Sequence, residues 1–523
     1  MLNAIPRPRA KLHGLVLLAP LARCLPAVGA MAALLVGSAL PASVAAQEHH
    51  HYKLIDVGTF GGPQSFVHEN AEVVTNHGTL VGDADTSTSD PNFPNSCLLC
   101  AQDPFIFHAF QWRDGVLTDL RALPGANSSS AFWTSNSGLA VGFSEDGSVD
   151  PLLGIPAVHA VLWRDGHIED LGTLEGGYES VALTVNSRGE VAGVSQNLVP
   201  DPFFPLQTQQ RTFLWEKGKM KDIGTLGGAS AGTLGINFNV EMNERGHIVA
   251  CSDTSAVNPA TGFPVVEPFL WEPDTIISLG SFGGTSGCAT FINNRDQVVG
   301  YSNLAGDLSS HPFLWERGRP LVDLGTLGGP GGVAEWITEQ GVVVGGADIP
   351  TSSAPGCNGP RLFHAFLWRQ GVMTDLGTIA GTDCSAGAAA NSKSQVVGAS
   401  FTLDFSVVDA FLWENGSLAD LNTLVSSPSA LHLEKGVAIN ERGEIAGFGT
   451  LPNGATRAFL LIPCDENHPD IEGCDYSPVE VNAVTASRAT EAAPQKQLTP
   501  QEISRIRDLL TNRHRGFVPG TMH

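Results

Sequence analysis

A short motif ending in tryptophan recurs along the chain and constrains its fold more than any other feature. Seven of the nine tryptophans close a strand-like piece that reads Phe-Leu-Trp or a near variant. The gaps between them run from 44 to 56 residues. A period of this length predicts an array of similar units, such as a propeller or a solenoid. The seven residues are Trp112, Trp163, Trp215, Trp271, Trp315, Trp368 and Trp413.

Each unit holds four strand-like pieces, which we call A to D in chain order, with D ending in the tryptophan. A two-residue turn such as Asp114-Gly115 or Asn415-Gly416 leads from D into the next A. Turns of this type favour positive φ and predict a tight hairpin of D with A. Pieces B and C form a second hairpin around an Asn-x-x-Gly turn, as at residues 186–189, which suits a type I turn followed by a left-handed glycine.

The two ends of the array complement each other. The chain opens with a piece A near 55–58 that lacks its D, and closes with a piece D near 458–461 that lacks its A. An open solenoid needs polar caps instead. We therefore predict an all-β, eight-bladed β-propeller, closed by pairing of the C-terminal strand with the N-terminal blade. Seven blades are the alternative, because the unit from Leu117 to Trp163 is irregular.

The D pieces also predict the core. Phe and Trp of Phe-Leu-Trp are two residues apart and share one face of the sheet. We expect them to pack against the next blade. Because the tryptophans recur in register, we interpret them as core residues rather than as a platform for sugar rings.

The repeat motifs resemble a known family. The carriers are His-Ala-Phe-Leu-Trp at 364–368, Asp-Leu-Gly-Thr-Leu-Gly-Gly at 323–329 and the pattern Asn-x-x-Gly-x-Val-Val-Gly-x-Ser. They are similar to the HAF-repeat family of bacterial extracellular proteins, over nearly all of 52–463. The resemblance implies an exported, repeat-built protein and adds no catalytic residues.

The N-terminus has the features of a signal peptide. Residues 1–46 contain no Asp or Glu, and an apolar run near 25–40 precedes Val44 and Ala46, which suit the −3 and −1 positions of a cleavage site. We predict cleavage before Gln47, with an uncleaved membrane anchor as the alternative. No later segment approaches 18 apolar residues, so we expect an exported protein, extracellular or periplasmic, without membrane insertion of the mature chain.

The predicted organisation has five parts. A capping-box start at Thr499 and apolar residues at helical spacing predict a short amphipathic helix near the C-terminus. The parts are a signal peptide at 1–46, the HAF-repeat β-propeller at 47–463, a Cys-flanked loop and flexible linker at 464–498, the helix at 499–513 and a basic tail at 514–523.

Eight cysteines follow the predicted cleavage site, an even number that suggests disulfides in an exported chain. The repeat register places two pairs on one face, one unit apart, and a third pair around a polar loop. Cys97 and Cys100 form a lone CxxC, for which a redox or zinc role is the alternative to a structural disulfide. The pairs are Cys251 with Cys288, Cys357 with Cys384, Cys464 with Cys474 and Cys97 with Cys100.

Charge and loop lengths bear on partners. A net charge of −24 repels phosphates and excludes a general nucleic-acid-binding role. The longest irregular segments all fall between pieces on one face of the predicted propeller, and variable loops on a rigid scaffold often bind ligands. A protein or glycan ligand is expected there, of unknown identity. These candidate binding loops are 83–107, 143–158, 194–210, 252–267 and 346–362.

Several motifs suggest chemistry that the repeat pattern argues against. Residues 228–232 match GxSxG around Ser230, but the nucleophile elbow needs a strand-to-helix turn in an α/β sheet. Four units begin D with histidine and seven carry an aspartate in A, and such even spacing favours structural contacts over a metal ring or a catalytic pair. The histidines are His108, His159, His311 and His364, and the aspartates are Asp56, Asp119, Asp170, Asp222, Asp323, Asp375 and Asp420.

Metal binding has only weak support. The run at 49–51 of three histidines is interpreted as a flexible tail, a poor metal ligand. Asp83, Asp85 and Asp90 carry oxygens that suit calcium, but their spacing does not match an EF-hand. We predict no metal site and no cofactor, with calcium as the weak exception.

The sequence thus predicts an exported, non-enzymatic repeat protein that binds or scaffolds through its loop face. One alternative is a secreted propeller enzyme acting on polysaccharide, with acidic residues of the central channel as acid and base. The other is a structural protein of the cell envelope. An enzyme is expected to show one pair of carboxylates at the channel mouth that departs from the repeat pattern.

Overall fold

The computed structural model describes residues 47–69, 71–97, 99–100, 103–203, 208–232, 240–350 and 362–481. The predicted signal peptide, the predicted helix at 499–513 and the basic tail at 514–523 lie outside these residues. Cys357 and the loop around it, at 351–361, also lie outside them. Within the described part, no helix has both the length and the apolar character needed to cross a membrane.

The described chain is almost entirely β, and its strands form small antiparallel sheets in the predicted order B, C, D, A. Five of the sheets consist of four consecutive strands. These are β3(Gly61–Phe66), β4(Leu80–Ser89), β5(Phe105–Arg113) and β6(Val116–Asp119); β7(Ser129–Thr134), β8(Ala140–Val149), β9(Pro156–Arg164) and β10(His167–Gly172); β11(Ser180–Val185), β12(Val191–Pro200), β13(Thr208–Glu216) and β14(Lys219–Asp222); β24(Gly332–Ile337), β25(Val343–Asp348), β26(Phe363–Arg369) and β27(Val372–Asp375); and β28(Cys384–Ala390), β29(Val396–Phe401), β30(Val408–Glu414) and β31(Ser417–Asp420).

Two further units are joined in a nine-stranded sheet. A single parallel pair, Val266 with Ser286, connects β18 to β20 and holds the two units in one sheet. The strands are β15(Gly227–Ala231), β16(Glu241–Met242), β17(Ile248–Val257), β18(Pro264–Glu272) and β19(Thr275–Ser278), then β20(Gly283–Ile292), β21(Val298–Leu304), β22(Ser310–Trp315) and β23(Val322–Asp323).

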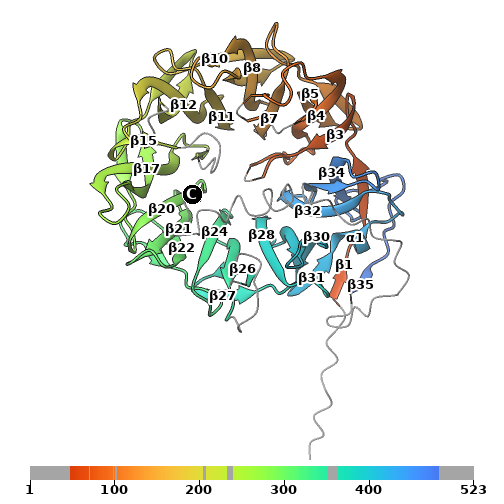
Figure 1. Ribbon diagram of the computed structural model, residues 1–523. Coiled ribbons are helices and arrows are strands. Elements are labelled where there is room, and N and C mark those ends of the chain that lie inside the picture. The colour runs from red at the N-terminus through yellow and green to blue at the C-terminus, as the bar shows by residue number, and fades with distance from the viewer. Residues whose placement is uncertain are drawn as a thin grey trace, which may run out of the picture. The chain divides into compact units, whose positions relative to one another are not determined.

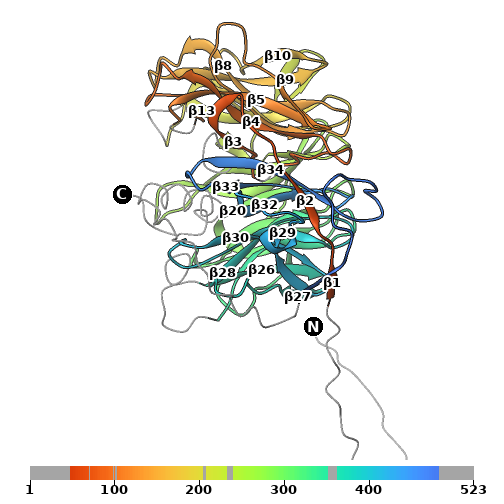
Figure 2. The ribbon, with the colours of Figure 1, turned by 90° about the vertical axis from the view of Figure 1, so that its right-hand side faces the viewer.

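The first long strand of the described chain pairs with the last long one. A sixth four-stranded sheet has the order β2(Tyr52–Asp56), β34(Thr456–Pro463), β33(Ile445–Thr450), β32(His432–Ile439). Its register sets Asp56 opposite Phe459, as an A strand lies beside a D strand elsewhere. Figure 2 shows β2 running beside β34. Strand β1(Gln47–His49) pairs with β35(Val479–Val481), and one short helix, α1(Leu421–Leu424), follows β31.

The sheets pack side by side around an axis, which is the arrangement of a β-propeller. The B strands form one edge of each sheet and contact the B strands of neighbouring sheets, as β7 contacts β11 and β24 contacts β28. Figure 1 shows β7, β11, β24 and β28 on the inner side of their sheets, and β10, β27 and β31 on the outer side. The B strands therefore line the axis.

The repeat motif has a direct packing reason. In each D strand the residue at the phenylalanine position is fully buried, as Phe411 is, and in seven of the eight units it is opposite a glycine of the C strand. Gly398 faces Phe411, and a Cβ atom added there would lie 2.8 Å from Cζ of the ring. The glycine of the Val-Val-Gly motif in piece C thus leaves the space that the phenylalanine ring occupies.

Candidate functional site

The four D-strand histidines are structural. Each one pairs with the aspartate of the neighbouring A strand in its own sheet, at N–O distances of 2.9 to 3.0 Å. The A strand is the outer edge, so these residues are not grouped on the axis. Arginine replaces histidine in two other units, where Arg211 pairs with Asp222 and Arg457 with Asp56.

The A-strand aspartates also hold the turn that follows them. Asp375, for example, accepts a hydrogen bond from the N–H of Gly377 at 2.8 Å and one from His364. Burial raises the pKa of the Asp375 carboxyl, but these hydrogen bonds outweigh burial, and the pKa is lowered. Seven of the eight units carry such an aspartate, and in the remaining one Ser278 accepts the equivalent N–H, that of Gly280, which fits the structural role that the even spacing indicated.

The other sequence motifs also have local explanations. The hydroxyl of Ser230 donates to Asp201 at 2.9 Å and accepts the N–H of Gln210, so it is a loop contact. The histidine run is not a free tail, because β1 is paired and His49 is buried against Glu414 at 2.9 Å. Asp83 accepts hydrogen bonds from His68 and Ser130.

Asp85 and Asp90 contact partners of their own. Asp85 accepts the N–H of Gln64, and Asp90 accepts the hydroxyl of Ser96. The three aspartates considered for calcium thus face different hydrogen-bond donors.

Disulfide bonds join Cys97 with Cys100, Cys251 with Cys288, and Cys464 with Cys474. Cys288 lies within strand β20 rather than in a loop. Cys384 is also disulfide-bonded, and its predicted partner Cys357 lies outside the described residues. The sulfurs of Cys97 and Cys100 lie near a carboxylate oxygen of Glu145, but the disulfide occupies them.

The candidate binding loops fall at the ends of the C and D strands. Four consecutive units have long C–D hairpins, β4–β5, β8–β9, β12–β13 and β17–β18. Apolar side chains on these hairpins are about half exposed, including Phe93, Leu152, Leu198 and Val257. The loop at 346–362 is described only to residue 350 and at 362.

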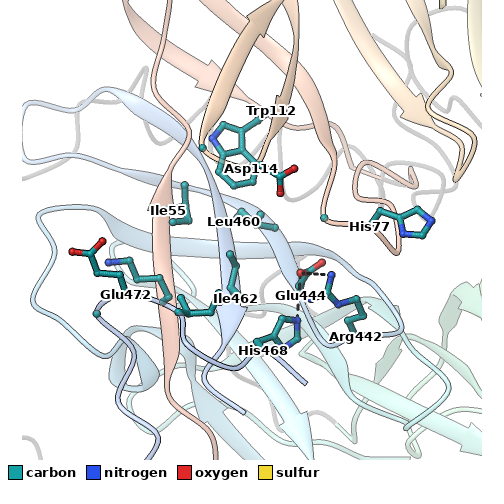
Figure 3. Close-up of a pocket in the computed structure, with 15 residues that line it drawn as sticks. Ile55, His77, Trp112, Asp114, Arg442, Glu444, Leu460, Ile462, His468 and Glu472 are labelled. Carbon is teal, nitrogen blue, oxygen red and sulfur yellow. Dashed lines mark ion pairs between the residues drawn. The ribbon is translucent and has the colours of Figure 1, made fainter. Parts of the chain in front are cut away.

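A groove of about 670 Å³ lies where β2 meets β34. Elsewhere a tight turn joins D to A, but here the two strands come from opposite ends of the chain, and the loop after Cys464 lines the groove instead. Figure 3 shows Trp112 and Asp114 of the β5–β6 hairpin above Ile55, Leu460 and Ile462. The groove has an apolar floor.

The charged residues at one end of the groove neutralise one another. Buried His468 lies 2.7 Å from Asp465 and 3.4 Å from Glu444, which also pairs with Arg442 (Figure 3). Burial acts to lower the pKa of His468, but its contacts with Glu444 and Asp465 outweigh burial and raise it. This network fixes the C-terminal loop on the last sheet.

The second candidate site lies on the axis, where three aromatic rings meet. Trp133 of β7, Phe291 of β20 and Trp336 of β24 come from different sheets. The ring centroids of Phe291 and Trp336 are 3.8 Å apart, and those of Trp133 and Phe291 are 6.5 Å apart. Side chains from inner strands thus fill part of the axis.

An axial recess borders these rings. It consists of two cavities of about 120 and 60 Å³, both lined by Glu72, Phe291 and Glu339. Glu441 lines the larger cavity, and Glu241 and Glu244 line the smaller one. Five carboxyl groups therefore gather in one small space.

Glu72 and Glu241 depart from the repeat pattern. Counted back from the Asn-x-x-Gly turn, the residues equivalent to Glu241 carry apolar side chains or, once, the hydroxyl of Thr184. The residues equivalent to Glu72 are Phe132, Leu183, Val240, Thr290, Glu335, Ala388 and Val437. Glu241 is thus unique at its position, and Glu72 has a carboxyl group in common with Glu335 and differs from the other six equivalents. The departure is visible only when the eight B pieces are aligned by their turns.

The electrostatics of the recess favour protonated carboxyl groups. Burial, followed by the charges of Glu244, Glu339 and Glu441, raises the pKa of Glu72 to about 7. Burial and then the charge of Glu72 raise the pKa of Glu241 well above its usual value. Oε2 of Glu241 is buried without a hydrogen-bond partner among the described residues. Two neighbouring carboxyl groups whose pKa values are raised in this way can exchange protons with a bound molecule.

The turns around the recess hold its mouth in place. The residue after the turn asparagine reaches the next unit, so that the N–H of Asn294 donates to Glu339 and the N–H of Glu244 donates to Asn294. The same contact joins the last unit to the first, from the N–H of Glu441 to Asn76 at 3.0 Å. Mouth carboxylates are therefore fixed by backbone groups rather than by basic side chains.

No protein-family model and no curated protein sequence matches the chain. Among solved structures, it is similar to the β-propeller domain of the Trilobed protease from Pyrococcus furiosus (8% identity, TM-score 0.38, covering 71% of this chain and 95% of that one). It is also similar to the acylaminoacyl peptidase of Pyrococcus horikoshii (9%, 0.36, 77% and 58%) and to dipeptidyl peptidase 4 of Porphyromonas gingivalis (10%, 0.39, 66% and 55%). The chain thus spans little more than half the length of these two peptidases.

These comparisons correct one prediction. The similar structures are mostly peptidase and hydrolase propellers, which contradicts the prediction of a non-enzymatic protein that binds or scaffolds through its loop face. Motifs repeated in every unit dominated that prediction, and the carboxyl groups that depart from the repeat were given no weight. At these identities and TM-scores the comparisons do not show that this chain is itself an enzyme.

Proposed function

We propose that the protein is an exported hydrolase that cleaves glycosidic bonds in its axial recess, with Glu72 and Glu241 as the acid–base pair. The observation that carries the proposal is the meeting of these two carboxyl groups beside the aromatic rings on the axis, with Glu241 unique at its repeat position and Glu72 matched only by Glu335. Glycoside hydrolysis commonly uses two carboxyl groups, one protonated and one ionised.

The two environments assign the two roles. Glu241 is buried, burial and the charge of Glu72 raise its pKa well above the usual value, and one of its oxygens has no hydrogen-bond partner among the described residues and is available to carry the proton. It donates that proton to the glycosidic oxygen as the bond to the anomeric carbon breaks. Glu72, whose pKa is about 7, takes a proton from the water that adds to the anomeric carbon. The pair is regenerated when the proton returns to Glu241.

The remainder of the recess suggests the class of saccharide. Trp133, Phe291 and Trp336 present apolar surfaces, which suit the C–H faces of sugar rings. Glu244, Glu339 and Glu441 give the mouth a negative charge, which disfavours uronic acids and sulfated sugars. The recess is small, so the substrate is a neutral or amino sugar at the end of a chain.

The scaffold of this proposal is a closed, eight-bladed propeller. The pairing of β2 with β34 supports closure, as does the hydrogen bond from Asn440 to the backbone oxygen of Thr75 at 2.8 Å. The disulfide bonds support export to an oxidising compartment. Closure matters for the chemistry because Glu72 and Glu241 are contributed by different units.

The test is release of reducing ends from a panel of neutral, amino and acidic oligosaccharides by the purified protein. We expect activity on a neutral or amino oligosaccharide, a loss of at least 100-fold in Glu241→Gln, and a loss of similar size in Glu72→Gln. The control is Glu169→Gln, which replaces an exposed carboxylate on outer strand β10 and should retain full activity.

Two results would contradict the proposal. One is the absence of product from every oligosaccharide with a correctly folded protein, which would favour the role of a structural envelope protein. The other is activity that survives both axial substitutions, which would move the reaction centre away from the axis.

A further inference from the structure

Neighbouring units contact each other through a repeated hydrogen-bonding arrangement on the loop face. An aspartate begins the C–D loop of one unit and reaches the A–B loop of the next. At Asp201 both carboxylate oxygens have a hydrogen-bond donor. One accepts the N–H of Phe203 at 2.8 Å, and the other accepts the hydroxyl of Ser230 at 2.9 Å. Ser230 in turn accepts the N–H of Gln210.

We call the boundary between two neighbouring units a seam. The seam before this one, between the second and third units, has the same arrangement but a carboxyl group in place of the hydroxyl. Asp150 begins the C–D loop after β8, and its Oδ1 accepts the N–H of Leu152 at 2.6 Å. Glu179 stands where Ser230 stands at the next seam, since its Oε2 accepts the N–H of Val158 at 3.0 Å. A carboxylate thus replaces the hydroxyl donor, and the Asp150 carboxylate meets a second carboxylate.

Both acids are completely buried, with relative exposures of 0%. Asp150 Oδ2 and Glu179 Oε1 each lack a hydrogen-bond donor, although the two carboxyl groups are close enough to share a proton, and neither residue forms an ion pair with a basic side chain within the described part of the chain. Burial, and then the neighbouring Asp150, raise the pKa of Glu179 to about 8. Two like charges buried together are strongly unfavourable unless something positive lies between them.

A third oxygen at this seam is also without a partner. Gln196 of β12 is buried, and its N–H donates to the backbone oxygen of Glu179 at 2.8 Å. Residues directly opposite in an antiparallel pair place their side chains on the same face. By this pairing, the Gln196 side chain lies on the face of the sheet that carries the Glu179 side chain. Oε1 of Gln196 has no donor among the described residues, whereas a buried amide oxygen normally accepts a hydrogen bond or binds a cation.

From this arrangement we propose that Asp150, Glu179 and Gln196 form a calcium site between the second and third units. The three free oxygens are carboxylate and amide oxygens, which are the ligands that Ca²⁺ prefers, and water completes its six to eight positions. The ion neutralises the pair and joins the C–D loop of one unit to the next. It replaces the hydroxyl bridge that Ser230 provides at the following seam.

The site differs from the three aspartates first considered for calcium, which have donors of their own. It is also separate from the axial recess and does not depend on the proposed hydrolase activity.

The test is calcium titration of the chelator-treated protein by calorimetry and thermal unfolding at pH 7.5. We expect saturable binding with a dissociation constant between about 10 µM and 1 mM, and a rise in the unfolding temperature over the same range. Asp150→Asn should weaken binding by at least 100-fold. Because it also removes the buried repulsion, it should unfold no earlier than the wild type without calcium.

The matched control is Asp201→Asn at the next seam, where Ser230 already satisfies the carboxylate. This variant should retain the calcium effect in full. Glu179→Gln provides a second variant if Asp150→Asn folds poorly, and its calcium affinity should fall in the same way.

Three results would overturn the proposal. They are no binding up to 10 mM calcium, binding that is unchanged in Asp150→Asn and Glu179→Gln, and equal loss in Asp201→Asn. If calcium changes neither the binding heat nor the unfolding temperature of the wild type, but its stability falls as the pH rises through 8, the two carboxyl groups share a proton instead, and the calcium proposal fails.

Discussion

The glycine beneath each phenylalanine ring offers a sharp test of how the blades are packed. Gly398 of β29 is paired with Gly387 on one side and with Phe411 on the other. A Cβ atom at Gly398 would lie 2.8 Å from Cζ of Phe411 and closer still to the backbone oxygen of Ala386. Neither group can yield easily, because one is a fully buried ring and the other belongs to the strand ladder.

We expect Gly398→Ala to destabilise the protein by about 2 kcal/mol. Overpacking of a core costs about 1–3 kcal/mol, and the lower chain entropy of alanine returns only about 0.5–1 kcal/mol. This corresponds to about a 30-fold shift of the folding equilibrium. Urea unfolding followed by tryptophan fluorescence and by far-ultraviolet circular dichroism measures the effect and tests whether one transition describes it.

The matched control is Gly387→Ala on the facing strand. A Cβ atom there has its nearest neighbour, the backbone oxygen of Gly345, at 3.3 Å, so small adjustments accommodate it and the change should stay within about 1 kcal/mol. Equal effects of the two substitutions, or stabilisation by Gly398→Ala, would refute the packing argument.

Three further predictions concern covalent, seam and charge interactions. Removal of the bond between Cys251 and Cys288, 37 residues apart, by a double alanine substitution should cost about 4 kcal/mol from chain entropy, and an unchanged urea midpoint would contradict this. Asn440→Ala removes a buried amide that donates across the seam between the last and first units and should cost about 1–3 kcal/mol in the same assay, whereas a neutral result would argue against that seam. The hydrogen bond with Asp409 raises the pKa of His432 to about 9. The contribution of this pair to the stability of the fold is therefore complete below pH about 6.5 and is lost as the pH rises through about 9. An NMR titration should show the pKa of His432 returning toward 6.5 in Asp409→Asn, and no change would exclude the pairing.

The repeats made most of the fold predictable from the sequence. The constant spacing from tryptophan to the A-strand aspartate reflects a tight hairpin, in which Phe366 pairs with Asp375. Local turn chemistry and alternation are enough for such pairs. The irregular register within the B–C hairpins, such as the shift after Ala131, was not predicted, because it arises from packing between strands rather than from turn residues.

Contacts between distant parts of the sequence were harder to foresee. The histidine run looked like a flexible tail because it is polar and follows a cleavage motif. In the structure β1 pairs with β35, and His49 is buried against Glu414. Burial raises the pKa of Glu414, but the hydrogen bonds from His49 and Gln395 outweigh it, and the pKa is lowered. No local pattern encodes this pairing.

The axial site was missed for a related reason. Glu72 and Glu241 are ordinary acidic residues in an acidic chain, and their distance in sequence hides their shared environment. The available signal was their position in the repeat, where the other units mostly carry apolar or hydroxyl side chains. Only the structure shows that the two positions border one recess.

The most direct test of the axial site is an NMR titration of carboxyl-labelled glutamate, with Glu72 assigned by its loss in Glu72→Gln. Burial on the axis, followed by the charges of the neighbouring carboxyl groups, predicts half-protonation of Glu72 near pH 7, and a lower pKa of Glu72 when Glu339→Gln removes one neighbouring charge. A Glu72 carboxyl that titrates near its ordinary value of about 4.3 and ignores that substitution would contradict the acid–base pair.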